Sequence, residues 1–123
     1  MVGTNAPLLP TQLKRVARRA TLGLGRNGSI SGNGSGDIFI AFSTANSGAF
    51  SSTKPVDVKM VPNDSLDPVF AATVEATEEA IINAMIAAES MTGIDNHKVT
   101  ALPHDQLKAV LGKYNRLNKR EPD

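Results

Sequence analysis

The segment Asn33-Gly34-Ser35-Gly36-Asp37-Ile38-Phe39-Ile40-Ala41-Phe42-Ser43 joins a glycine-rich turn to an apolar stretch. The run from Asp37 to Ser43 is apolar, aromatic and β-branched and is bounded by glycine, which predicts a buried β-strand. Ser35 and Asp37 stand two positions apart at the start of this strand, and side chains at i and i+2 of a strand point to the same side. The segment therefore predicts a hydroxyl and a carboxylate side by side at the mouth of a strand.

Helices and strands alternate on both sides of this segment. Upstream, a short extended stretch is followed by Thr11, a candidate N-cap for a helix over about 12–24, in which apolar residues recur at helical spacing. Downstream, the pattern predicts a strand over 56–61, a helix over 67–91, a strand over 98–102 and a helix over 103–117. This order predicts an α/β (α+β layered) architecture.

The helix over 67–91 is the longest predicted element. Asp67 as N-cap and Pro68 at the first helical position form a strong start signal. The second half, from Ala80 to Ala88, is apolar almost all round, which indicates burial between layers. Without a covering layer this half exposes apolar surface, and association or poor solubility is then expected.

Length and composition exclude several classes of protein. The 123 residues, 41% of them hydrophobic, predict a single domain over 1–123 with a disordered charged tail at 118–123. The net charge of +1 argues against a strongly basic nucleic-acid-binding protein, and the absence of cysteine excludes a disulfide framework or a thiolate metal site. The sequence carries no signal-peptide pattern and no bilayer-length apolar run, so a cytoplasmic location without a membrane partner is expected.

Other motifs carry weaker signals. The segment 23–28 matches G-x-G-x-x-G, but a helix precedes it, whereas a dinucleotide site needs a preceding strand and a following helix, so no cofactor is expected. His97 and His104 fall in no triad or metal-ligand spacing, so no metal is expected either. Gly3-Thr4 allows an N-terminal Thr nucleophile released by self-cleavage, which stays a minor alternative.

The helix over 12–24 exposes a basic face. Nucleic acid binding is one interpretation of this face, and a solvated surface or a contact between subunits is the favoured one, because no aromatic residue lies among the charges to stack on a base. The residues that form it are Lys14, Arg15, Arg18 and Arg19.

Ser35 and Asp37 admit two interpretations. A carboxylate beside a hydroxyl can orient it, take part in proton transfer or hold a substrate amine. The alternative is a serine turn that caps the strand, which the pattern alone favours.

Six segments, in order, resemble the L-aminopeptidase/D-esterase family, the DmpA-like group that includes D-aminopeptidases and β-peptidyl aminopeptidases. The resemblance covers nearly the whole chain, and its motifs are long enough to be specific. The segments are 5–15, 17–20, 33–46, 75–81, 91–93 and 102–105.

The resemblance implies a serine N-terminal-nucleophile hydrolase with an αββα sandwich fold. Members of the family are made as a precursor that cleaves itself before a Ser, which becomes the N-terminal nucleophile of the smaller β chain. They form oligomers of αβ units, need no metal or cofactor, and release N-terminal residues from small peptides, amides or esters through an acyl-enzyme. Ser35 and Asp37 match a supporting Ser and an acidic residue that is Glu in some relatives.

The sequence departs from the family pattern at its start. Met1-Val2-Gly3-Thr4 lies where a β chain of the family is already several residues into its first strand, so the Ser nucleophile is expected just upstream of Met1. The sequence is therefore expected to be a β-subunit-like fragment that is inactive alone and pairs with an α-subunit-like chain of the same precursor. A non-catalytic remnant that assembles with an intact relative remains an alternative, as does the basic-helix nucleic-acid-binding module.

Overall fold

The computed structural model describes residues 1–49 and 53–117. The tail expected to be disordered, 118–123, lies outside the described residues. The chain divides into two compact units, Met1–Ile81 and Ile82–Asp123. The expectation of a single domain stays a prediction.

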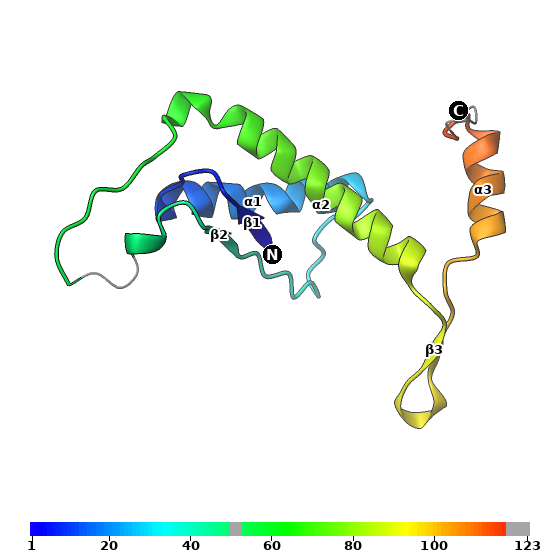
Figure 1. Cartoon of the computed structure of the whole chain (residues 1–123). Coiled ribbons are helices and arrows are strands. Elements are labelled where there is room, and N and C mark those ends of the chain that lie inside the picture. Colours follow the sequence, from blue (N-terminus) through cyan, green and yellow to red (C-terminus); the bar gives the residue numbers. More distant parts are fainter. Residues whose placement is uncertain (50–52, 118–123) are drawn as a thin grey trace, which may run out of the picture. The chain divides into compact units, whose positions relative to one another are not determined.

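The first unit is built on a β–α–β arrangement. Strand β1 (Val2–Thr4) and strand β2 (Ala41–Ser43) pair in parallel, and helix α1 (Pro10–Arg26) connects them and lies against both (Figure 1). Gly3 stands opposite Phe42 in this pair. Main-chain bonds continue the ladder at both ends, because the Val2 N–H donates to the Ile40 carbonyl and the Thr44 N–H to the Thr4 carbonyl.

Helix α1 begins earlier than the sequence predicts. Pro10 occupies the first helical turn and Leu9 is the N-cap residue, so the prediction that Thr11 caps the helix is wrong. Proline has no N–H to satisfy and its fixed φ suits the first helical position, which explains the earlier start. The Gln12 side chain completes this end, because its Oε1 accepts the Leu9 N–H at 3.0 Å.

The core of the first unit lies between α1 and the start of helix α2 (Asp67–Ala87). Val16 and Leu66 are fully buried, and Leu8 and Phe70 pack with them. The buried side of α1 carries Gln12, Val16, Ala20 and Gly23. The apolar face predicted for this helix is therefore confirmed at Val16 and Ala20. Leu13 and Leu24 are only half-buried, while a glutamine and a glycine occupy the ends of the buried side.

Helix α2 starts at Asp67 as predicted but ends at Ala87, before the predicted limit of 91. Its buried residues, Phe70, Thr73 and Val74, all lie in the first half. In the second half Ile82, Met85 and Ile86 are exposed, so the predicted burial between layers is not found in the described chain. This is the exposed apolar surface expected for a helix that lacks a covering layer. No helix of the described ranges 1–49 and 53–117 combines the length and the apolar character needed to cross a membrane.

Two strand predictions are wrong, one in extent and one entirely. The strand predicted over 37–43 covers only Ala41–Ser43, and Ile38 before it is 82% exposed. The short partner β1 limits the ladder, and no second neighbour among the described residues pairs with β2. The segment 56–61 forms no strand: the Asn46 side chain bonds the Lys59 backbone, and the Val61 N–H donates to the Pro7 carbonyl.

The second unit holds a small hairpin and a helix. Strands β3 (Met91–Thr92) and β4 (Lys98–Val99) pair antiparallel, and helix α3 (His104–Lys113) follows. The predicted strand over 98–102 and helix over 103–117 are thus present but shorter. No residue from 82 to 117 is buried, so the described part of this unit has no core of its own.

Gln12 is a buried polar side chain whose loss we expect to be costly. It is 2% exposed, and its Nε2 donates to the Val61 carbonyl at 2.7 Å and to Asn63 Oδ1 at 3.0 Å. Gln12→Met keeps the size but leaves these acceptors unpaired, so the free energy of unfolding should fall by about 1–3 kcal/mol. Urea denaturation of the chain measures this free energy. Gln106→Met, an exposed glutamine in α3, is the control and should change stability by less than about 0.5 kcal/mol. Equal effects of the two substitutions would contradict the role given to Gln12.

Candidate functional site

Ser35 and Asp37 lie in the loop between α1 and β2, and both are exposed. The Ser35 N–H donates to the Gly32 carbonyl at 2.8 Å, and the Asp37 N–H donates to Ser35 Oγ at 3.3 Å. This is the serine turn of the second interpretation. The strand begins only at Ala41, so the two side chains are not placed together by a strand, and their functional role stays a prediction.

The turn uses only part of the hydrogen-bonding capacity of the Ser35 hydroxyl. Its Oγ accepts one N–H, and a hydroxyl has a second lone pair and a proton of its own to donate. Space around it is open, because a Cβ placed on Gly34 or Gly36 meets nothing within 4 Å. A reacting group or a substrate backbone can therefore approach Ser35 from outside the described chain.

The loop that carries Ser35 and Asp37 lies at the end of the strand pair where β1 and β2 begin. Because β1 and β2 are parallel, both start at the same edge, and the segment from Ser35 to Ile40 leads into β2 at that edge. The Val2 N–H donates to the Ile40 carbonyl at 2.8 Å, which fixes the start of β1 beside the same segment. A hydroxyl and a carboxylate thus precede β2 on the side where β1 begins.

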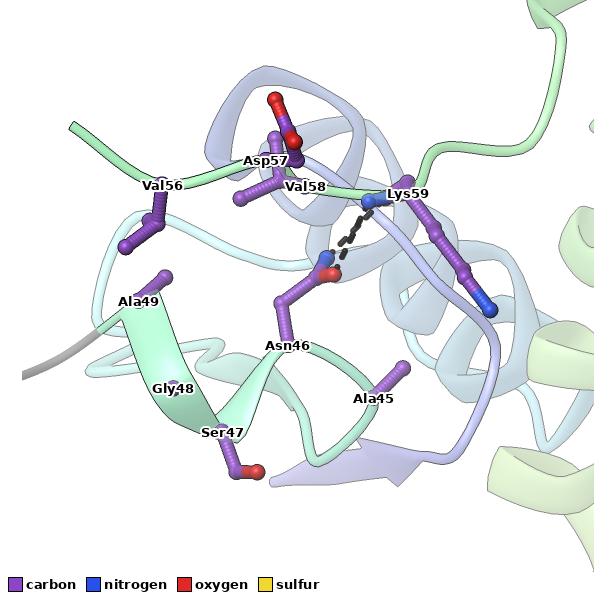
Figure 2. A pocket seen from close by; sticks show the side chains of 9 residues that line it. All are labelled: Ala45, Asn46, Ser47, Gly48, Ala49, Val56, Asp57, Val58 and Lys59. Carbon is purple, nitrogen blue, oxygen red and sulfur yellow. Dashed lines mark hydrogen bonds between the residues drawn. The ribbon is translucent and has the colours of Figure 1, made fainter.

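A pocket of about 280 Å³ lies beyond the other end of β2. Figure 2 shows it between the segment 45–49 and the segment 56–59, with the Asn46 amide bonded to the Lys59 backbone in both directions, at 3.0 and 3.1 Å. The charged residues that line it, Asp57 and Lys59, are exposed. Since the pocket follows β2 whereas Ser35 and Asp37 precede it, the pocket and the predicted site belong to opposite ends of the strand pair.

The basic face of α1 is partly used inside the first unit. The guanidinium carbon of Arg19 lies 3.9 Å from the centre of the Phe70 ring, and that of Arg15 lies 5.0 Å from it. Arg26 pairs with Glu78 at 3.0 Å. These contacts join α1 to α2, so Arg15, Arg19 and Arg26 each have a structural role. Among the interactions described, Lys14 and Arg18 of the predicted basic face make no such contact.

The G-x-G-x-x-G segment, 23–28, lies at the C-terminal end of helix α1. Gly23 is inside α1, packed against α2, and Gly28 follows the helix with φ of 93° and donates its N–H to the Gly25 carbonyl. These glycines lie at the C-terminal end of α1 and not at a helix N-terminus, so the segment lacks the phosphate-binding geometry of a dinucleotide site. Thr4 lies within β1, and its Oγ1 accepts the Ala6 N–H at 3.1 Å, a local turn contact.

The two histidines lie in the second unit. His104, at the start of α3, has its Nε2 3.0 Å from the Ile86 carbonyl, while the main chain of His97 closes the turn of the β3–β4 hairpin. Within residues 1–49 and 53–117 no three His, Asp or Glu side chains gather in a way that could hold a metal ion.

Sequence reasoning missed the polar side chains that fix the loops. Gln12 ties α1 to 61–63, Asn46 holds the Lys59 backbone, and Ser43 Oγ donates to the Ala6 carbonyl. The position of Gln12, one turn before Val16 on the same helix face, is a signal that could have revealed it. Asn46 gives no local signal, because its partner lies 13 positions away.

Comparison with known proteins shows a family match over most of the chain. The model of Peptidase family S58 matches residues 1–99. A β-peptidyl aminopeptidase BapA of Sphingosinicella microcystinivorans is 49% identical over 118 residues, which are 95% of this chain and 30% of that protein. The chain thus spans less than a third of the length of this relative.

Two solved structures resemble the chain closely. The L-aminopeptidase D-Ala-esterase/amidase of Ochrobactrum anthropi, a variant of the Ntn-hydrolase fold and a prototype for the serine aminopeptidases, is 53% identical with a TM-score of 0.82. The match covers 93% of this chain and 32% of that one. The PH0078 protein of Pyrococcus horikoshii OT3 is 45% identical with a TM-score of 0.84, over 91% of this chain and 32% of that one. The described chain therefore has part of an Ntn-hydrolase fold.

Proposed function

Because the chain belongs to peptidase family S58, we propose that it forms the β-subunit-like part of a serine N-terminal-nucleophile aminopeptidase. The complete enzyme releases N-terminal residues from small peptides, amides or esters through an acyl-enzyme. The relatives whose names state an activity, a β-peptidyl aminopeptidase and an L-aminopeptidase D-Ala-esterase/amidase, support this substrate class.

The register of β1 and β2 is the observation that carries the proposal. Val2 stands opposite Ala41, so the same register continued upstream places Met1 opposite Ile40 and the residues before Met1 beside Phe39, Ile38 and Asp37. A Ser nucleophile a few residues before Met1 then lies next to the Ser35–Asp37 turn. In this proposal the nucleophile, the Ser35 hydroxyl and the Asp37 carboxylate share one edge of the strand pair.

The chemistry assigns a role to each group. The free α-amino group of an N-terminal Ser acts as the base that activates its own hydroxyl. Ser35 assists this nucleophile by hydrogen bonding through a hydroxyl that the serine turn leaves open. Asp37 orients the pair or holds the substrate amine.

An α-subunit-like segment of the same precursor completes the active site and covers the second half of α2. Two observations support this partner: the chain spans about 30% of the length of its curated relative, and the exposed side chains of Ile82, Met85 and Ile86 form apolar surface on α2. Exposed apolar surface of this kind marks an interaction site. The αβ units then assemble into a homo-oligomer, as the family resemblance implies.

We expect the isolated 123-residue chain to show no turnover of β-, L- or D-aminoacyl p-nitroanilides, and the complete polypeptide that carries the upstream Ser and the α-like segment to show it. The physical reason is that nucleophile and base both lie outside residues 1–123. Release of p-nitroaniline measures the difference. The coding sequence upstream of Met1 supplies the complete polypeptide and should hold an in-frame Ser codon within about ten codons, a span set by the usual length of a strand.

The controls separate the alternatives. Turnover by the isolated chain that disappears in Ser35→Ala would overturn the need for an upstream nucleophile. A complete polypeptide that assembles but neither cleaves itself nor turns over any of the substrates would identify the chain as a non-catalytic assembly remnant instead.

A further inference from the structure

Gly3 and Phe42 make an unusual cross-strand pair. They stand opposite each other in the β1–β2 ladder, and the Phe42 ring lies over the glycine: a Cβ placed on Gly3 would be 2.9 Å from Phe42 Cζ and 3.3–3.4 Å from the two ε carbons. Real Cβ contacts essentially never come under 3.0 Å. Because these atoms are the outer end of an exposed side chain, any other residue at position 3 would displace the ring from the strand.

This contact selects one register of the strand pair. A slip by two residues would bring the ring over Met1 or Asn5, and both carry side chains where Gly3 has none. A slip by one residue would exchange the two faces of the strand. In the observed register Val2 and Thr4 are half-buried while Gly3 and Phe42 face outward.

Phe42 contributes to this register more than to the core. Its side chain is 47% exposed, and it is not part of the buried cluster around Val16 and Leu66. An aromatic ring laid across a strand glycine is a known means of pinning strand register. Within the described chain the Phe42 ring therefore contacts Gly3 rather than the core.

We propose that Phe42 is a positioning residue for the aminopeptidase reaction: by seating its ring on Gly3 it fixes the register of β1, and with it the place of the upstream nucleophile relative to Ser35 and Asp37. This inference rests on the proposed function. A two-residue slip moves the strand by about 6.6 Å. A displacement of only about 1 Å can cost a factor of about 100 in rate.

The test is a double-mutant cycle in the complete enzyme. Gly3→Ala displaces the ring from the strand and Phe42→Leu removes it, so both variants lose the same contact. We expect each to lower kcat by about 10- to 100-fold with KM changed less than about 2-fold, and the double variant to lose little more than either single variant. Ile30→Ala, at a 92% exposed position outside the strand pair, is the control and should leave kcat nearly unchanged.

A second readout uses the 123-residue chain itself. The amides of Val2 and Thr44 donate to the Ile40 and Thr4 carbonyls, so their hydrogen exchange reports the register directly. We expect faster exchange at both amides in Gly3→Ala, in Phe42→Leu and in the double variant, and little change at amides inside α1.

The outcomes are distinct. Unchanged kcat in Phe42→Leu, fully additive losses in the double variant, or a loss of kcat without faster exchange at Val2 and Thr44 would each overturn the positioning role. If the wild-type complete enzyme has no turnover, the proposed function fails, the positioning role fails with it, and the exchange experiment still decides whether Gly3 and Phe42 set the register.

Discussion

Ser35→Ala should lower kcat of the complete enzyme by about 10²- to 10⁴-fold, the range for loss of a group that assists proton transfer. Ser29→Ala should leave kcat nearly unchanged. The two serines form matched turns in one loop: the Ser31 N–H donates to Ser29 Oγ at 3.2 Å, and the Asp37 N–H donates to Ser35 Oγ at 3.3 Å. If Ser35 served only its turn, the two substitutions would have the same effect.

The measurement is the steady-state rate of p-nitroanilide release, with the extent of self-cleavage followed on a denaturing gel. Asp37→Asn keeps the size of the side chain and removes its charge, so it tests the carboxylate separately from the turn, which uses only the Asp37 main chain. Asp37→Glu should retain part of the activity, since it keeps the carboxylate and the family resemblance implies Glu at this position in some relatives. Equal kcat in Ser35→Ala and Ser29→Ala would reduce Ser35 to a turn residue.

Gly23→Ala should destabilise the first unit by about 1–3 kcal/mol, the usual cost of overpacking. A Cβ on Gly23 would lie 2.6 Å from Thr77 Cβ and 2.6 Å from the Val74 carbonyl oxygen. Backbone cannot move aside as a flexible side chain can, so α1 and α2 must separate. The free energy of unfolding from urea denaturation measures the effect.

Gly25→Ala is the matched control for this substitution. Gly25 lies in the same helix two positions later, and a Cβ there meets nothing within 4 Å. Exchange of glycine for alanine in an open helical position should stabilise by up to about 1 kcal/mol, so the two variants should change stability in opposite directions. Thr77→Ala should rescue Gly23→Ala only in part, because Thr77 Cγ2 leaves while Cβ and the Val74 carbonyl remain. A stabilising Gly23→Ala would contradict the close helix contact.

The family and the general fold class could be predicted from the sequence. The resemblance to the L-aminopeptidase/D-esterase family, which rested on six ordered segments, is confirmed by the match to Peptidase family S58 and by the solved relatives of Ntn-hydrolase fold. The helices at 12–24, 67–91 and 103–117 were placed correctly to within a few residues, because helical periodicity is a local property of the sequence.

The predicted strands were less accurate, and the reason is physical. A strand needs a partner to bond its main chain, and β2 reaches only as far as the short β1 extends beside it. The segment 56–61 alternates like a strand, yet its backbone bonds the Asn46 side chain and Pro7. Alternation describes the two faces of a segment but not whether a neighbouring strand is present.

The sequence by itself determined the elements that rest on local physics, namely the helices and the serine turn before β2, and it determined the family through motif order. Only the tertiary structure decided the parallel register of β1 on β2, the Phe42 ring over Gly3, the close contact at Gly23 and the burial of Gln12. Each of these depends on a partner distant in sequence, and local patterns carry no information about which distant groups come within contact distance. The predicted site depends on both kinds of information. The sequence identified Ser35 and Asp37, and the strand register gives the reason why an upstream nucleophile would lie beside them.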